Sequence, residues 1–210
     1  MFDWNGTFLN DVKAAHEGMA RIFRHFGLNP PSLTEYRNEV TPDIVTFYYE
    51  RGVPRDTDLA AMTKIYKTAI EENWSKVELG LYAESLIRCC EAKGITRVLI
   101  TMESEETIKR RLVQFKLDDK FSDVIPRVSK KAEVMREMLK KYNVEDPREA
   151  FYMGDIIGDV EAAKSAGVVA IAYTGGYNSK ERLQAAKPDM LADSFWDIVL
   201  WLCQDDPDID

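Results

Sequence analysis

The sequence contains few of the features that mark secreted, membrane-spanning or metal-thiolate proteins. Cysteine occurs only at Cys89, Cys90 and Cys203, and no two of these form a CxxC pair. An odd, unpatterned set of this kind predicts reduced thiols rather than a disulfide or zinc framework. No run approaches the ~20 apolar residues of a membrane span, and no basic-then-apolar signal peptide opens the chain. These absences predict a cytoplasmic protein without a membrane partner.

Basic residues are also fewer than acidic residues. The 28 Lys and Arg residues face 36 Asp and Glu residues, which leaves a net charge of -8. Such a balance disfavours nucleic acid, because that partner selects a basic surface. The two histidines, His16 and His25, lie nine positions apart on different faces of one predicted helix, which disfavours a histidine metal site. No GxGxxG opens a helix, so a dinucleotide cofactor is not indicated.

The first half of the chain reads as helical. Apolar residues recur at helical spacing from Val12 to Phe26 and stop at Gly27. Apart from Met1 and Phe2, nothing resembles a strand before Val98. Further helices are predicted over 33–39, 42–51, 56–72 and 79–93.

The second half alternates strands with helices. Short apolar runs predict strands at 97–101, 123–126, 150–153 and 168–173, and helices are predicted between them at 104–115, 131–142 and 159–166. This alternation predicts an α/β fold with a doubly wound parallel sheet, over which the helical block forms an inserted cap. The predicted limits are 1–12 and 82–210 for the core and 13–81 for the cap. The acidic tail 204–210 is predicted to be disordered.

Carboxylates follow two of the predicted strands. Asp3 ends the first apolar stretch, and Asp155 and Asp159 lie on the strand-to-helix turn GDIIGD. Ligands of parallel sheets gather at the carboxyl ends of the strands, so these three side chains are expected at one edge. Oxygen ligands from separate loops suit Mg²⁺. A plain helix cap is the alternative for GDIIGD taken alone.

Two further positions offer groups for an anion. Thr101 ends the strand at 97–101, where its hydroxyl could bind a phosphate oxygen, although β propensity alone also explains a threonine there. Lys130 and Lys131 precede the helix at 131–142, where a buried ammonium could neutralise phosphate. Taken alone, such a pair is more often solvated surface.

The order of these elements carries a resemblance. Asp3, Thr101, Lys131 and the Asp155-x-x-x-Asp159 turn, each at a strand end, resemble the haloacid dehalogenase-like hydrolase superfamily over nearly the whole chain. FDWNGTFLND, the segment 79–102 and GDIIGDVEAAKSAGV are similar to its phosphoglycolate phosphatase-like branch. The resemblance implies a Rossmann-like core with a helical cap, and Mg²⁺-dependent hydrolysis of a small phosphorylated metabolite by a monomer or homodimer.

The resemblance also implies roles for individual residues. Asp3 would attack phosphorus and form an aspartyl-phosphate, and Thr101 and Lys131 would bind the phosphoryl group. Lys131 is preferred over Lys130 by the length of the helix and turn that follow. The metal ligands would be Asp3, the backbone carbonyl of Asn5, Asp155 and, indirectly, Asp159. Gly6 and Thr7 are placed among the phosphate-binding residues.

Asn5 departs from the family pattern. The family normally has an aspartate here, which protonates the leaving group and then activates water, and an amide does neither. General acid–base catalysis contributes ~10²–10⁴-fold, so slow turnover is expected. The alternatives are phosphoryl transfer to another acceptor, as in a mutase, or a weakly active metabolite-binding protein. A dehalogenase fits less well, because that chemistry needs no Mg²⁺.

The start of the chain is short for this family. Only Met1 and Phe2 precede Asp3, whereas a central strand normally has about five residues. We therefore expect a native apolar segment upstream of Met1, and a lack of in-frame apolar codons there would contradict this hypothesis.

Overall fold

The middle of the sheet is held by the first three residues of the chain. The computed structural model describes residues 1–41 and 43–204. Phe2 forms parallel bridges with Leu99 on one side and Met153 on the other. The backbone of Phe2 bonds to Val98 and Ile100, with N–O distances of 2.9 Å. Three residues therefore suffice to fill the central position and to bring Asp3 to the carboxyl edge.

The other strands extend the sheet on both sides of this segment. They are β3 (Val98–Ile100), β4 (Asp123–Ile125), β5 (Phe151–Gly154), β6 (Val169–Tyr173) and β7 (Met190–Ala192). Their order is β4, β3, residues 1–3, β5, β6, β7, and all the pairings are parallel. The predicted α/β fold class with a doubly wound parallel sheet is confirmed.

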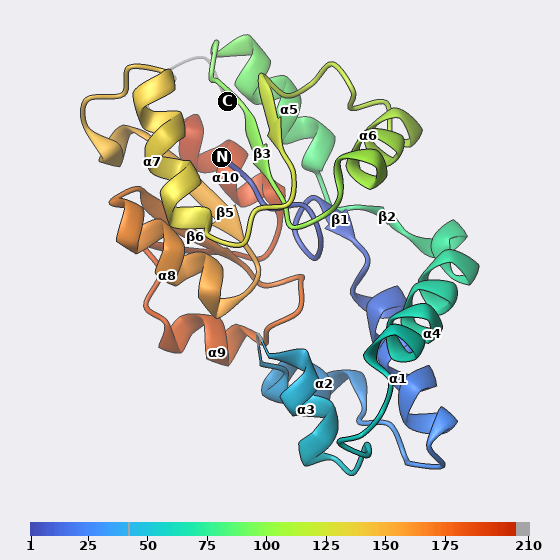
Figure 1. Cartoon of the computed structure of the whole chain (residues 1–210). Coiled ribbons are helices and arrows are strands. Elements are labelled where there is room, and N and C mark those ends of the chain that lie inside the picture. Colours follow the sequence, from blue (N-terminus) through green and yellow to red (C-terminus); the bar gives the residue numbers. More distant parts are fainter. Residues whose placement is uncertain (42, 205–210) are drawn as a thin grey trace.

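Helices cover both faces of the sheet (Figure 1). Side chains alternate along each strand, so Leu99 and Ile171 pack on one face, and Ile100 and Ala170 pack on the other. The first face is covered by α5 (Ala83–Ala92), α6 (Glu105–Gln114) and α10 (Phe195–Leu202). The second is covered by α7 (Lys131–Lys141), α8 (Ile157–Ala166) and α9 (Lys180–Ala185).

A helical insertion stands beside this core. It contains α1 (Val12–His25), α2 (Leu33–Glu39), α3 (Ile44–Glu50) and α4 (Leu59–Glu72), and Figure 1 shows it below the sheet with α2 and α3 beneath α9. A separate apolar cluster, which includes Phe23, Phe47 and Met62, holds these helices together. Short 3-10 turns lie at Trp74–Lys76 and Pro147–Glu149.

The sequence analysis missed the ribbon through which the chain enters and leaves this insertion. β1 (Leu9–Asn10) pairs antiparallel with β2 (Glu78–Leu79), where no strand was predicted. Strands of two residues are too short to show an alternating pattern. The helix predicted over 79–93 begins only at Ala83, because Tyr82 takes a left-handed φ of 65°. The predicted limits of core and cap stay a prediction.

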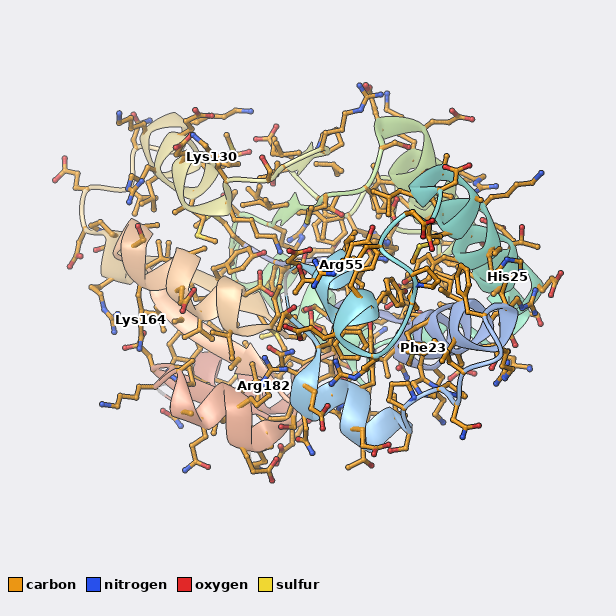
Figure 2. All side chains as sticks on the ribbon, turned by 60° about the horizontal axis from the view of Figure 1, so that its bottom comes forward. Phe23, His25, Arg55, Lys130, Lys164 and Arg182 are labelled. Carbon is orange, nitrogen blue, oxygen red and sulfur yellow. The ribbon has the colours of Figure 1, made fainter. Side chains whose placement is uncertain are left out.

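Two arginines connect the insertion to the core. Arg37 of α2 donates to the backbone carbonyls of Thr174 and Asn178. In the opposite direction, Arg182 of α9 donates to the carbonyls of Arg37 and Val40 at 3.2 and 2.8 Å. Figure 2 shows Arg182 at the junction of the two helices. Each guanidinium thus satisfies carbonyls on the opposite side of the junction.

Two remaining sequence predictions concern membranes and the tail. None of the helices that the structure describes is both long and apolar enough to cross a bilayer. The tail predicted to be disordered lies outside the described residues from 205 onward.

Phe195 is expected to be a major contributor to stability. Its side chain is fully buried and its ring centroid lies 4.9 Å from that of Phe8 and 5.3 Å from that of Tyr173. Phe195→Ala should lower the free energy of unfolding by about 3–5 kcal/mol, measured by denaturant titration. Val113→Ala, at a position 62% exposed, is the control and should change it by less than about 0.5 kcal/mol. A loss below about 1 kcal/mol for Phe195→Ala would contradict this packing.

Candidate active site

Three acidic side chains meet at the carboxyl edge of the sheet. Asp3 follows the central segment, Asp155 follows β5, and Asp159 lies in the first turn of α8. All three are buried, and one carboxylate oxygen of each lies within 4.8 Å of the others. The structure therefore brings together the three carboxylates that the sequence analysis placed at one edge.

Lys131 lies against this cluster, and Lys130 does not. The Lys131 ammonium is 2.6 Å from Asp159 Oδ1 and 3.0 Å from Asp3 Oδ2. Lys130, which directly precedes α7, is exposed and pairs with Glu133 at 3.1 Å (Figure 2). Of the two candidates, Lys131 is thus the one that faces the acidic cluster.

The charges at this edge do not balance. Three carboxylates, when ionised, face one ammonium, which leaves a net negative charge of two. Burial raises the pKa of Asp3 to about 7, against the lowering effect of Lys131. Burial and the neighbouring carboxylates also raise the pKa of Asp155 well above its usual range. Burial alone would lower the pKa of Lys131, but Asp159 and Asp3 outweigh it and hold that pKa well above its usual range.

The Asp155 carboxylate is held by two hydrogen bonds and by the close approach of two backbone segments. Its Oδ1 accepts a hydrogen bond from the Thr7 hydroxyl at 2.7 Å, and its Oδ2 accepts one from the Tyr177 backbone N–H at 2.7 Å. A Cβ at Gly6 or Gly176 would lie 2.2 or 2.1 Å from Oδ2, so only glycine lets the backbone approach so closely. The carboxylate is therefore fixed in one orientation.

The other predicted phosphate-binding residues have partners within the protein. The Gly6 N–H donates to Asp11 Oδ1 at 2.8 Å, and the Thr7 hydroxyl is committed to Asp155. Thr101 is buried at the end of β3, and its Oγ1 accepts a hydrogen bond from the Glu103 N–H at 3.1 Å. An oxygen that accepts there can still donate its own proton. The roles of Gly6, Thr7 and Thr101 toward phosphate stay predictions.

Asp11 is a site residue that the sequence analysis missed. It precedes α1 as a typical N-cap aspartate would, yet it makes no capping bond with its side chain. Instead its Oδ2 accepts a hydrogen bond from the Asn5 amide at 2.8 Å, and the Tyr177 phenol donates to the same carboxylate. Burial raises the pKa of Asp11, although these hydrogen bonds oppose the rise. The hydrogen bonds from Asn5, Gly6 and Tyr177 distinguish this residue from an ordinary cap.

Comparison with known proteins agrees with this geometry. The family model for haloacid dehalogenase-like hydrolases matches residues 1–173. The chain belongs to this family. A phosphoglycolate phosphatase of Pseudomonas putida is 25% identical over 210 residues, which cover 92% of this chain and 75% of that relative. A phosphoglycolate phosphatase of Vibrio vulnificus is 30% identical over 113 residues, which cover 51% of this chain and 49% of the relative.

Solved structures of this hydrolase family share the fold. A haloacid dehalogenase-like protein from Agrobacterium tumefaciens superposes with a TM-score of 0.77 at 16% identity, covering 97% of this chain and 96% of that chain. A hydrolase from Pseudomonas syringae gives 0.73 at 18% identity, covering 98% and 97%. The predicted family, its phosphoglycolate phosphatase-like branch and the assignment to phosphatase-type enzymes are confirmed.

The acidic cluster of this hydrolase has the composition of a Mg²⁺ site. Its ligand atoms are hard carboxylate oxygens that converge from two strand ends and one helix. The net charge of two that Lys131 leaves uncompensated is the charge of one divalent cation. Asp3 and Asp155 fit as direct ligands. Both oxygens of Asp155 and both oxygens of Asp159 already accept hydrogen bonds, so hydrogen bonding does not rank these two residues as ligands, and the indirect position of Asp159 stays a prediction.

The raised pKa of Asp3 predicts how stability depends on pH without metal. Folding shifts this pKa from 3.8 to about 7, so the folded state holds the proton more tightly than the unfolded state. In EDTA, the Asp3 contribution to the free energy of unfolding should therefore decline as the pH rises from about 4 to about 7. The measurement is the wild-type value minus that of Asp3→Asn, by denaturant titration at each pH. An Asp3 contribution to the free energy of unfolding that rises with pH would contradict the raised pKa of Asp3.

Proposed function

We propose that this hydrolase cleaves small phosphate monoesters in the cytoplasm, with Asp3 as the nucleophile and Mg²⁺ as the cofactor. One observation carries the proposal. A buried aspartate at the carboxyl edge of the sheet is paired with Lys131 and flanked by two further carboxylates. The names of the phosphoglycolate phosphatase relatives support a small phosphorylated metabolite as the substrate.

The proposed reaction has two displacements at phosphorus. A carboxylate oxygen of Asp3 forms a bond to phosphorus while the bond from phosphorus to the ester oxygen breaks, and the alkoxide leaves and takes a proton from solvent water. Water then attacks the aspartyl-phosphate, which releases inorganic phosphate and restores Asp3. Bound Mg²⁺ would offset the negative charge of the cluster and of the phosphoryl oxygens. The Lys131 ammonium would offset part of the same charge, and the Thr101 hydroxyl would donate to a phosphoryl oxygen.

The proton for the leaving alcohol has no donor at position 5. The amide of Asn5 has no proton acidic enough to be donated to a leaving group at neutral pH, and its N–H donates a hydrogen bond to Asp11. Alcohols that leave as poor anions should therefore be released slowly, whereas phenols should leave more readily. The same deficit would slow the attack of water on the aspartyl-phosphate.

This deficit supports two alternative functions on the same site. A phosphoenzyme that water attacks slowly would pass its phosphoryl group to another hydroxyl, as a phosphotransferase or mutase does. A protein that binds the ester and Mg²⁺ without turnover would serve as a metabolite-binding protein. Retention of phosphate on an acceptor alcohol identifies the first, and ligand binding without phosphate release identifies the second.

The nucleophile and the metal can be tested together. Phosphate release from phosphoglycolate and other esters should require Mg²⁺ and stop in EDTA. Asp3→Asn should lose at least about 10³-fold in kcat, since no bond to phosphorus can form. Lys130→Ala is the matched control for Lys131→Ala: the first should keep near-native activity, and the second should lose most of it. Phosphate release by Asp3→Asn at the wild-type rate would refute the proposed nucleophile.

Restoring an acid at position 5 should raise the rate only if Asp11 is neutralised. Asn5→Asp alone places two carboxylates where the amide and Asp11 now lie 2.8 Å apart, and their repulsion disturbs both. Asn5→Asp with Asp11→Ser removes this conflict, and a serine suits a helix N-cap. The double variant should hydrolyse alkyl esters about 10²-fold faster than wild type.

The control for this experiment is Asp11→Ser alone, which should bring no gain. The gain of the double variant should be smaller for phenyl phosphate, because phenolate leaves without protonation. Equal rates for the double variant and the wild type on alkyl esters would show that the missing acid does not limit turnover.

A further inference from the structure

A large apolar cavity lies between the helical insertion and the core. Its volume is about 580 Å³, within the range of small-molecule sites. One wall comes from α1–α4, and the other from the first turn of α8, residues 177–178 and α9. The lining is predominantly aliphatic and aromatic, and it includes Ile22, Val40, Ile44, Met62, Tyr66 and Ile156.

The core wall of this cavity is continuous with the acidic cluster. Tyr177 lines the cavity, and its backbone N–H is the donor to Asp155. Ile156 also lines it, and its N–H donates to Asp159 Oδ2 at 3.2 Å. The two residues that bound the cavity therefore also bind the carboxylates. Ile156 adjoins Asp155 in the chain, so the cavity lies within reach of the organic part of an ester whose phosphate is at the cluster.

The cavity offers one cation for a second acidic group, and that cation is already hydrogen-bonded within the protein. Among the described residues that line it, Arg182 is the only cation, and its guanidinium donates to the carbonyls of Arg37 and Val40. Figure 2 shows Arg182 at the junction between α9 and α2 rather than within the insertion. The one charged side chain besides it, Glu161, is an anion that would repel a carboxylate. A carboxylated organic group would lose its hydration here and would meet the Glu161 carboxylate and a single guanidinium that already donates to two carbonyls.

We infer that the organic part of the preferred ester is an uncharged aromatic or branched aliphatic group, which occupies this cavity. The inference rests on the proposed phosphatase function and names its substrate class. Apolar area removed from water is then the source of selectivity, and a small acid such as phosphoglycolate makes poor use of the site.

The test compares esters whose leaving alcohols are of similar acidity, so that differences report the cavity and not the chemistry. With Mg²⁺, kcat/KM for benzyl phosphate and 3-methylbutyl phosphate should exceed that for ethyl phosphate and phosphoglycolate by at least about tenfold. Equal values, or a preference for phosphoglycolate, would overturn the inference while leaving the phosphatase function intact.

A matched pair of variants locates the effect. Leu59 lines the cavity and is 47% exposed, whereas Leu200 lies on α10 and is 49% exposed. Leu59→Lys should shift the ratio of kcat/KM for benzyl phosphate over phosphoglycolate toward phosphoglycolate by at least about fivefold. Leu200→Lys should leave the ratio unchanged. Equal ratios in the two variants would place the selectivity elsewhere and overturn the assignment.

A binding measurement separates this inference from the proposed function. Benzylphosphonate and methylphosphonate carry a C–P bond, so their affinity for the full chain with Mg²⁺, measured by calorimetry, does not depend on hydrolysis. Benzylphosphonate should bind at least about tenfold more tightly. If no ester is hydrolysed but this preference holds, the phosphatase proposal fails and the cavity assignment stands. If the two phosphonates bind equally, the cavity assignment fails.

Discussion

The buried pairing of Lys131 with Asp3 and Asp159 is the interaction on which the rest of the site depends. Taking charges out of water is costly, and this cost is offset only when each charge has close partners. Lys131 supplies one such partner to two carboxylates at 3.0 and 2.6 Å. The third, Asp155, relies on neutral donors from Thr7 and Tyr177. The remaining negative charge makes the edge receptive to a divalent cation and then to a phosphate ester.

The need to hold Asp155 explains several features of the surrounding loops. The backbone approaches its carboxylate closely at two glycines, Gly6 and Gly176, which belong to separate loops. The loop that contains Gly176 continues into Tyr177 and Asn178, which line the apolar cavity. In the proposed function, metal binding and substrate selectivity would both depend on this one loop. A change in that loop would be expected to alter both together.

The residue at position 5 has to be considered together with Asp11, because the Asn5 amide donates a hydrogen bond to the Asp11 carboxylate. The acid that the family normally has at position 5 is absent, but a buried carboxylate stands 2.8 Å from the amide that replaces it. The amide donates to Asp11, which an aspartate at position 5 could do only while protonated. The two positions therefore form a unit, and the effect of either residue is expected to depend on the other.

Much of the fold could be read from local pattern, because it arises from local rules. Short apolar runs predicted β3, β4, β5 and β6, and helical spacing predicted α1. The strand-end positions of Asp3, Asp155 and Asp159 predicted that these side chains would meet. Lys131 was preferred over Lys130 through family resemblance, and the structure faces it toward the cluster. The two-residue ribbon of β1 and β2 carries no periodic signal, so it was missed.

The sequence by itself therefore determined the α/β class, the family and the set of acidic residues at the sheet edge. Only the tertiary structure decided that Asp11 serves Asn5 rather than the helix it precedes. The tertiary structure also decided that Arg37 and Arg182 donate to backbone carbonyls across the junction. It likewise decided that an apolar cavity lies between the helical insertion and the core. The physical reason is that the arginine contacts and the cavity join elements distant along the chain, whose pairing depends on packing and not on spacing. The contact between Asn5 and Asp11 spans only six residues, but it depends on how the loop before α1 folds.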